Sequence, residues 1–328
     1  MKDKPLVSIL IPVYKRVDLA IEAIDSALSQ DYGNIEIVIG DNCSEDGTFQ
    51  ILQERYKDQD NIILFQNECN LGAVGNWIRC LEKANGVYIK FLWSDDLMAS
   101  NYISKAVLLF ESAPEIAFVY SSVLLFQETS QLNNKGLLRE RYKFEKRTGI
   151  YDADLFLLKI YKSSYLMPVS PGCALFRKEN LKILNEIPNR PAYDHKKNGA
   201  GIDLLVFLES LSGIRKFGYI DEPLNYFREH PLSISSFDTS IRIGYWTAKI
   251  YYLQEHNINH LWRDMNAEII SLTNHKDIFN QKKIQDTLST YYGMKSQEIF
   301  EYSVLRTFLW KIRYKLYTLS LKKYQKEV

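Results

Sequence analysis

The sequence predicts an α/β domain with a mostly parallel sheet flanked by helices, followed by a C-terminal helical extension. Three observations predict this architecture. Short apolar runs rich in β-branched residues, such as residues 6–11, suit strands that are buried on both faces of a parallel sheet. Amphipathic helical patterns separate these runs. After about residue 237 the pattern is helical to the end.

Strand and helix patterns alternate from the start of the chain to about residue 126. In the first predicted helix, Leu19, Ala23 and Ala27 recur on one face. Helices of this length between strands form βαβ units and therefore a parallel sheet. The predicted strands are residues 6–11, 35–40, 61–66, 86–93 and 116–126. The predicted helices are residues 17–30, 48–56, 73–84 and 98–110.

The pattern is less regular in the middle of the chain. Residues 127–149 are polar and charged without a clear period, which predicts a loop or an inserted hairpin. Residues 173–178 have the pattern of a strand, and residues 202–211 have that of a helix. No internal repeat or low-complexity linker is present in the sequence.

Composition limits the class of protein. The net charge of +1 argues against a nucleic-acid binder, because phosphate binding usually needs a basic excess. The four cysteines form no C-x-x-C pair, which is typical of a reducing cytoplasm. The N-terminal apolar run is too short for a signal peptide, and no run reaches about 18 apolar residues. We therefore expect a cytoplasmic protein.

Polar residues follow each of the first four predicted strands. Open α/β sheets bind ligands beyond the carboxyl ends of their strands, so these segments are expected to share one edge. Neither G-x-G-x-x-G nor G-x-x-x-x-G-K follows the first strand, which disfavours a dinucleotide fold and a P-loop. The four segments are residues 12–16, 40–48, 67–72 and 94–96.

Two adjacent acids, Asp95 and Asp96, follow the fourth predicted strand. Mg²⁺ and Mn²⁺ prefer carboxylate oxygens and are often shared with substrate phosphates. An ion on Asp95 would neutralise the charge of a departing diphosphate. Alternatively, the acids cap the helix over residues 98–110, and taken alone the pattern favours the cap.

Six segments occur in the order seen in family 2 glycosyltransferases, and the resemblance covers roughly residues 5–237. It points to the bacterial O-antigen and capsule branch of the family. The segments are VSILIPVYKR (7–16), IEIVIGDNCSEDGT (35–48), NLGAVGNW (70–77), FLWSDD (91–96), AGID (200–203) and HPLSIS (230–235).

The resemblance implies a GT-A fold and inverting transfer of a sugar from a nucleotide-diphosphate donor, aided by Mn²⁺ or Mg²⁺. It implies a domain over residues 1–237, with a nucleotide-binding half at 1–120 and an acceptor half at 121–237. A helical region over 238–328 would follow. The implied acceptor is a growing, lipid-linked surface glycan.

The resemblance also assigns the donor pocket. Asp41 matches the acid that binds a uracil or thymine ring, which favours UDP or dTDP donors, although it could instead form a turn. Asn70 and Gly72 match the family's Asn-x-Gly, and Gly72 would start the next helix close to the donor or serve only as a loop glycine. The base and ribose would be lined by Pro12, Val13, Tyr14 and Arg16.

The segment Trp93–Ser94–Asp95–Asp96 aligns with the family's D-x-D-D. Trp93 replaces the first acid, which alters the donor pocket, and it could stack on a sugar face or fill a gap. Asp95 keeps the position that usually touches the metal. Ser94 would line the donor site, and Asp96 would support it.

Asp203 falls at the position of the family's catalytic base, and Ile202 replaces the preceding Glu. Inverting transfer requires a carboxylate near the attacking hydroxyl. Alternatively, Asp203 is a helix N-terminal acid that the helix dipole favours. Asp194 is a weaker candidate for the base.

His230 begins an H-x-x-S-x-S pattern that completes the metal site or touches the diphosphate in some relatives. Neutral imidazole is a competent ligand for Mn²⁺, and less so for Mg²⁺. A lone histidine is, however, more often structural. Arg228 and Ser233 would support the phosphates.

Residues 304–325 carry Lys and Arg among apolar and aromatic residues, with no acid. Basic, aromatic-rich helices lie well on anionic membranes, so a peripheral location on the inner face of the cytoplasmic membrane is expected. The alternatives are a helix packed on the core or a homo-oligomer contact. The cations are Arg306, Lys311, Arg313, Lys315, Lys322 and Lys323.

Two other functions are compatible with parts of the sequence. Nucleotidyl transfer also uses strand-tip acids and metal, but it usually needs a Gly-rich loop that residues 12–18 lack. A non-catalytic sugar-nucleotide or glycan-binding module is suggested by Trp93 and Ile202. The sequence leaves the sugar and the linkage open.

Overall fold

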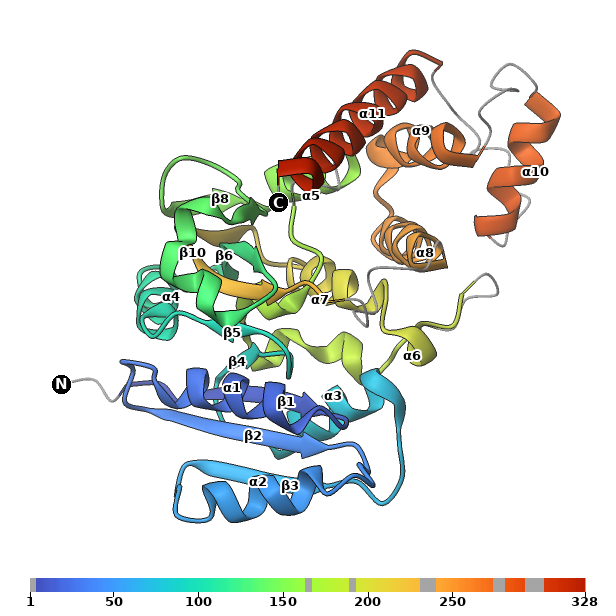
Figure 1. Cartoon of the computed structure of the whole chain (residues 1–328). Coiled ribbons are helices and arrows are strands. Elements are labelled where there is room, and N and C mark those ends of the chain that lie inside the picture. Colours follow the sequence, from blue (N-terminus) through green and yellow to red (C-terminus); the bar gives the residue numbers. More distant parts are fainter. Residues whose placement is uncertain are drawn as a thin grey trace.

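The computed structural model describes residues 4–162, 167–188, 193–230, 240–273, 281–292 and 304–327. These residues form one mixed sheet with helices on both sides (Figure 1). Its strands run in the order β3-β2-β1-β4-β9-β6-β10-β5, and the short strands β7 and β8 pair with β6 and β10. The predicted α/β architecture is confirmed.

The first half is the predicted series of βαβ units. Its four strands are parallel, in the order β3-β2-β1-β4. The register aligns Val13 with Asp41 and Asp41 with Gln66, so the first three strands end at the same level. The strands are β1 Val7–Val13, β2 Ile35–Asp41, β3 Ile62–Gln66 and β4 Tyr88–Phe91, and the helices are α1 Val17–Leu28, α2 Thr48–Tyr56 and α3 Gly72–Lys83.

The second half extends the sheet with antiparallel pairs. Strand β9 lies antiparallel between β4 and β6, and β10 runs parallel to β6. The elements are β5 Leu97–Met98, α4 Tyr102–Glu111, β6 Ile116–Phe126, α5 Ala153–Lys162, β9 Ala174–Arg177, α6 His195–Asn198, α7 Ile202–Ser210 and β10 Lys216–Arg228. Short 3₁₀ segments lie at Pro171–Cys173, Lys178–Asn180 and Lys182–Leu184.

The segment predicted as a loop or an inserted hairpin is more structured than its polar composition indicates. It contains a 3₁₀ segment at Thr129–Leu137 and two short strands, β7 Arg139–Arg141 and β8 Gly149–Asp152. Strand β7 folds back onto β6, whereas β8 pairs with β10. Because its strands join the main sheet, the segment is not an independent hairpin.

The C-terminal helices share a core with the sheet. Ile250 and Ile269 from these helices belong to the same buried apolar cluster as Phe118, Phe176 and Phe217 from the strands. That cluster crosses the predicted boundary at residue 237. The helices are α8 Ser240–Glu255, α9 Trp262–Thr273, α10 Gln281–Tyr292 and α11 Val304–Glu327, with a 3₁₀ turn at Asn259–Leu261. In Figure 1, α9, α10 and α11 lie at the top, and β2 and β3 at the bottom.

Helix α3 packs very closely on β2 at Gly40. A Cβ atom at Gly40 would lie 2.6 Å from the Cys80 Sγ and 2.7 Å from the Phe65 ring. Real Cβ atoms do not approach other atoms so closely, so a residue other than glycine would require the Cys80, Phe65 and Asn76 side chains to move. The packing of α3 against β2 therefore leaves no room for a side chain at Gly40.

We predict that Gly40→Ala lowers the free energy of unfolding by about 1–3 kcal/mol, because the methyl group overpacks this contact. Urea denaturation followed by circular dichroism measures the change. Gly33→Ala is the matched control, since a Cβ at Gly33 has no atom within 4 Å. Equal stability of the two variants would contradict the packing argument.

Candidate active site

An asparagine network holds together the loops at the carboxyl edge of the sheet. Asn42 follows β2, and its Nδ2 donates to the Asn70 Oδ1 at 2.9 Å and to the Gly72 carbonyl at 3.1 Å. Its Oδ1 accepts from the Asn67 Nδ2 at 3.1 Å and the Leu71 backbone N–H at 3.0 Å. One side chain therefore fixes both the segment after β3 and the first turn of α3.

Asn76 of α3 extends this network to β1. Its Nδ2 donates to the carbonyls of Gly40 and Val13, at 2.7 and 3.4 Å. Its Oδ1 accepts from the Asn67 Nδ2 at 2.9 Å. Sequence reasoning missed Asn42, Asn67 and Asn76. They could have been identified by their positions in the sequence, either directly after predicted strands or inside the NLGAVGNW segment.

Asp41 ends β2 and is 0% exposed. Its Oδ2 accepts from the Ser44 backbone N–H at 2.9 Å and from the Gln66 Nε2 at 2.8 Å. Its Oδ1 is buried and has no hydrogen-bond partner among the residues that the structure describes. An unsatisfied buried acceptor is costly, and the N–H group of a ligand could satisfy this oxygen once the residues that cover it move.

Asn70 and Gly72 lie where the first turn of α3 begins. The Asn70 Oδ1 accepts from the Gly72 backbone N–H at 2.9 Å, in addition to its bond from Asn42. Gly72 is the first residue of α3 and has a left-handed φ of 73°, which favours glycine. The expectation that this glycine starts the helix is confirmed.

The segment after β1 turns sharply out of the sheet. Lys15 and Arg16 are consecutive residues with left-handed φ angles of 60° and 54°. Such conformations are costly for residues other than glycine and gather at functional sites. The Lys15 backbone N–H donates to the Ser44 Oγ at 2.7 Å. Pro12 is half-buried, Val13 is buried and Tyr14 is exposed.

Asp95 is the meeting point of three loops. Its Oδ2 accepts from the Arg16 Nη1 at 2.8 Å and lies 2.9 Å from the His230 Nε2. Arg16, which follows β1, and His230, which follows β10, therefore meet at the carboxylate of Asp95, which follows β4. Neighbouring carboxylate and imidazole groups are a suitable donor pair for a divalent ion. In the described part of the chain, no cluster of three His, Cys, Asp or Glu side chains could hold a metal.

The donor pair at Asp95 and His230 fits an ion that also binds substrate phosphates. Mg²⁺ is commonly held by one or two carboxylates together with phosphate oxygens and waters, and Mn²⁺ accepts imidazole nitrogen. Both side chains are partly exposed, at 17% and 19%, so a ligand can reach them. The remaining ligands would have to come from a bound phosphate group and water.

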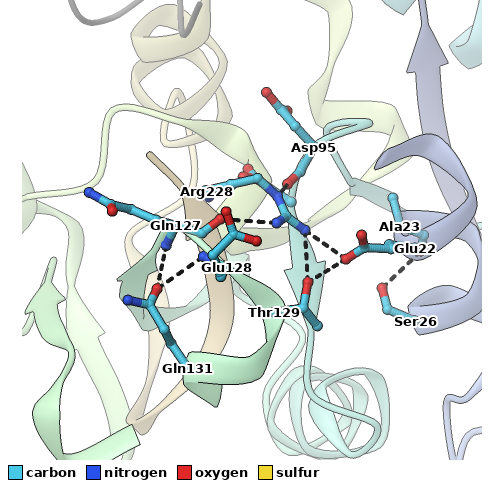
Figure 2. A network of polar contacts seen from close by, with 10 residues as sticks. Glu22, Ala23, Ser26, Asp95, Gln127, Glu128, Thr129, Gln131 and Arg228 are labelled. Carbon is cyan, nitrogen blue, oxygen red and sulfur yellow. Dashed lines mark hydrogen bonds and ion pairs between the residues drawn. The ribbon is translucent and has the colours of Figure 1, made fainter. Parts of the chain in front are cut away.

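Arg228 supports the loop of residues 94–96, here called the acid loop (Figure 2). Its Nε donates to the Asp95 carbonyl at 3.0 Å, and its Nη2 donates to the Glu22 Oε2 at 2.8 Å. Further bonds reach the Gln127 carbonyl at 3.1 Å and the Thr129 Oγ1 at 3.1 Å. Its guanidinium is thus engaged by protein acceptors, which assigns Arg228 to holding Asp95 in place.

Asp96 points into the protein. It is almost fully buried, and its Oδ1 accepts from the Arg228 backbone N–H at 2.9 Å. Burial, followed by the neighbouring Asp95 charge, raises the pKa of Asp96 well above its usual value. The helix-cap interpretation of the two acids is wrong, because β5 intervenes and the residue before α4 is Asn101.

Trp93 fills the gap between β4 and the segment that precedes β9. Its Nε1 donates to the Ser170 Oγ at 2.9 Å, and its ring lies 4.7 Å from that of Trp77. Trp77 in turn lies against Gly199, where a Cβ would meet its ring at 3.2 Å. These contacts link the acid loop to the turn that carries Asp203. The neighbouring Ser94 is buried.

Lys90 lies fully buried in β4, beneath the same loop. Its Nζ donates to the carbonyls of Phe91 and Gly172. Burial lowers the pKa of Lys90 to about 7, and the neighbouring ionisable groups of Cys173 and Asp96 oppose that shift. Lys90 was not identified from the sequence, because the residues around it have the pattern of an ordinary buried strand.

Asp203 sits in the first turn of α7 and is held by three hydrogen bonds. Its Oδ1 accepts from the backbone N–H groups of Gly201 and Leu204, both at 2.8 Å, and its Oδ2 accepts from the Tyr245 Oη at 2.8 Å. Burial raises the pKa of Asp203 to about 7, although these hydrogen bonds oppose the rise. A carboxylate with a pKa near 7 is suited to general base catalysis.

The turn before Asp203 is pressed against α8. A Cβ at Gly201 would lie 2.3 Å from the Gly244 carbonyl oxygen, and Gly201 has a left-handed φ of 89°. Ile202 is fully buried in the core, at the position of the family's Glu. Asp194 is exposed and accepts from the Lys196 backbone N–H at 3.0 Å, as a residue at a helix start does. The contribution of α8 to the site was not predictable from the local sequence.

Ser233 lies outside the residues that the structure describes, so no contact of it enters this site. None of the described helices is both long enough and apolar enough to span a bilayer.

Known proteins resemble this chain in sequence or in fold. The sequence model of "Glycosyl transferase family 2" matches residues 8–184. The GalNAc(5)-diNAcBac-PP-undecaprenol beta-1,3-glucosyltransferase of Campylobacter jejuni is 31% identical over 203 residues, which are 58% of this chain and 63% of that protein. The UDP-Glc:alpha-D-GlcNAc-diphosphoundecaprenol beta-1,3-glucosyltransferase WfaP of Escherichia coli is 40% identical over 117 residues, 36% of this chain and 45% of that protein.

Both matches cover less than two thirds of the relative's length. Among solved structures, residues 1–349 of S. aureus TarS in complex with UDP superpose with a TM-score of 0.61 and 18% identity. That superposition covers 87% of this chain and 80% of the TarS chain. At this identity the likeness concerns the fold, which is the GT-A fold.

We predict that Tyr245→Phe raises the pKa of Asp203 by about one to two units. The substitution removes a hydrogen bond that stabilises the charged carboxylate, and such a bond is worth about 1.5–3 kcal/mol. NMR titration of protein with carboxyl-labelled aspartate measures the shift, and the signal missing from Asp203→Asn assigns the peak. Tyr252→Phe on the same helix, near Glu209, is the control and should leave the pKa of Asp203 unchanged. An unchanged or lower pKa in Tyr245→Phe would contradict the role of its hydroxyl.

Proposed function

The chain belongs to glycosyl transferase family 2, and on this basis we propose that it moves a sugar from a nucleoside-diphosphate donor to a glycan, with inversion at the anomeric carbon. The observation that carries the proposal is the convergence at Asp95. Arg16 and His230, which lie far apart in the sequence, meet the same carboxylate oxygen at 2.8 and 2.9 Å. The resulting cluster of cation, acid and imidazole suits a diphosphate.

The donor nucleotide would bind over the end of β2. The buried, unpartnered Oδ1 of Asp41 would accept the ring N–H of a uracil or thymine, which favours UDP or dTDP. Tyr14 is exposed beside this position and would cover the base, with Pro12 and Val13 beneath it. The WfaP relative is named for a UDP-Glc donor, and TarS has been solved with UDP, which supports this assignment.

The diphosphate would lie at Asp95. Asp95 and His230 would hold Mn²⁺ or Mg²⁺, and Arg16 would add positive charge from the β1 loop. When bound, the ion would supply Lewis-acid neutralisation of the diphosphate charge. Arg228 would keep the loop of Asp95 and Asp96 in position, because its backbone N–H donates to the Asp96 Oδ1 and its Nε donates to the Asp95 carbonyl.

Asp203 would act as the base. Its Oδ2 would take the proton of an acceptor hydroxyl while that oxygen forms a bond to the anomeric carbon. The bond from this carbon to the diphosphate oxygen breaks at the same time, and its electron pair leaves with the nucleoside diphosphate. Attack from the side opposite the leaving group inverts the anomeric configuration without a covalent intermediate.

The acceptor would be a lipid-linked glycan of surface polysaccharide assembly, and the transferred sugar a hexose or deoxyhexose. Both relatives carry undecaprenol-linked saccharides in their names, which supports this acceptor class. Such an acceptor would place the protein on the cytoplasmic face of the cytoplasmic membrane.

We predict that Asp203→Asn lowers kcat by about 100- to 10,000-fold and leaves the affinity for UDP unchanged, because the amide cannot accept the proton. The wild-type rate should rise with pH through about 7, as Asp203 loses its proton. Release of nucleoside diphosphate with an undecaprenol-linked acceptor measures the rate. Asp194→Asn is the discriminating control, and loss of activity in that variant alone would move the base to Asp194.

We predict that UDP binds in calorimetry more tightly with Mn²⁺ than with EDTA, and more tightly than GDP. Asp95→Asn should weaken binding about tenfold with Mn²⁺ only, whereas Asp41→Asn should weaken it about tenfold in both conditions. The exposed Asp58, changed to Asn, is the control. Stronger binding of GDP, or no effect of Mn²⁺, would contradict the donor assignment.

A further inference from the structure

Helix α11 presents an unusual row of exposed apolar side chains. Six of its residues, here called the α11 stripe, are between 40% and 67% exposed. At about 100° per residue they fall within an arc of about 100° on one side of the helix. Contiguous exposed apolar surface of this kind marks an interaction site. The stripe consists of Leu305, Phe308, Leu309, Ile312, Leu316 and Leu319.

The opposite side of α11 is held by the rest of the protein. Thr307 and Trp310 are almost fully buried. Arg306 pairs with Asp264 of α9, and the Arg313 Nη1 donates to the Lys162 carbonyl at 2.9 Å at the end of α5. Figure 1 shows α11 beside α9. The stripe is therefore turned outward on a fixed helix and is not the apolar face of a loose tail.

The charge of the helix identifies the partner. Residues 304–325 contain no acid, and besides Arg306 and Arg313, which are engaged by α9 and α5, they include four lysines, of which Lys315 is exposed. A second copy of this chain would bring the same cations against its own, since a two-fold contact places like surfaces together. An anionic lipid surface satisfies both the apolar stripe and the cations, because long Lys and Arg side chains reach headgroups while apolar neighbours enter the acyl boundary.

We propose that α11 lies in the plane of an anionic membrane surface, with the α11 stripe inserted at the headgroup boundary and the lysines of the helix near lipid phosphates. This proposal does not depend on the donor or on the reaction. It gives the helical region a role in bringing the protein to a lipid-bound acceptor.

Vesicle flotation of the full chain, without donor or acceptor, tests the proposal. Wild-type protein should float with vesicles containing phosphatidylglycerol and remain below with phosphatidylcholine vesicles. The variant Leu305→Gln, Phe308→Gln, Ile312→Gln and Leu316→Gln should lose at least about tenfold in partitioning. Lys315→Gln with Lys322→Gln should weaken binding at low salt, where charge attraction is least screened.

The matched control changes exposed leucines elsewhere. Leu108 and Leu137 are 75% and 73% exposed on other elements, and Leu108→Gln with Leu137→Gln should bind vesicles as the wild type does. Circular dichroism melting verifies that each variant folds. Wild-type flotation by the stripe variant, or equal binding to both vesicle types, would overturn the proposal. So would a wild-type dimer, seen by analytical ultracentrifugation without lipid, that the stripe variant converts to a monomer.

Discussion

The site depends on one constraint, the register of the parallel strands. Because Val13, Asp41 and Gln66 lie side by side, the first three strands end at the same level. Their loops therefore open onto one edge, and short amide side chains such as Asn42 can span the distances between them. Asp41 is buried at this level, and its Oδ1 has no hydrogen-bond partner among the described residues. The register therefore also sets where the base of a nucleotide would bind.

Much of this fold could be predicted from the sequence, because the spacing of apolar residues along the chain distinguishes buried strands from amphipathic helices. The edge residues Asp41 and Asp95 were predictable for the same reason, since they end or follow strands. The asparagine network, Lys90 and the hydroxyl of Tyr245 were not. Their partners are distant in the sequence, and nothing local reveals that Asn76 reaches the Val13 carbonyl or that α8 touches Asp203. The bond from Arg228 to the Asp95 carbonyl was not predictable for the same reason.

The helical region and the sheet domain act together. Tyr245 of α8 holds the candidate base, Gly244 sets the close approach of its turn, and buried side chains of α8 and α9 join the core of the sheet. Helix α11 is fastened to the same body through Trp310 and turns its apolar stripe outward. A membrane contact made by α11 and the chemistry at Asp203 would thus be connected through one packed unit.

The most direct test of the central claim is a crystal structure of the protein with UDP and Mn²⁺, with anomalous diffraction used to locate the ion. The account predicts an anomalous peak bound by the Asp95 carboxylate, the His230 imidazole and the diphosphate. It also predicts that the uracil ring N–H donates to Asp41. An ion bound elsewhere, or UDP bound away from the ends of β1, β2 and β4, would contradict the assignment of this edge as the donor site.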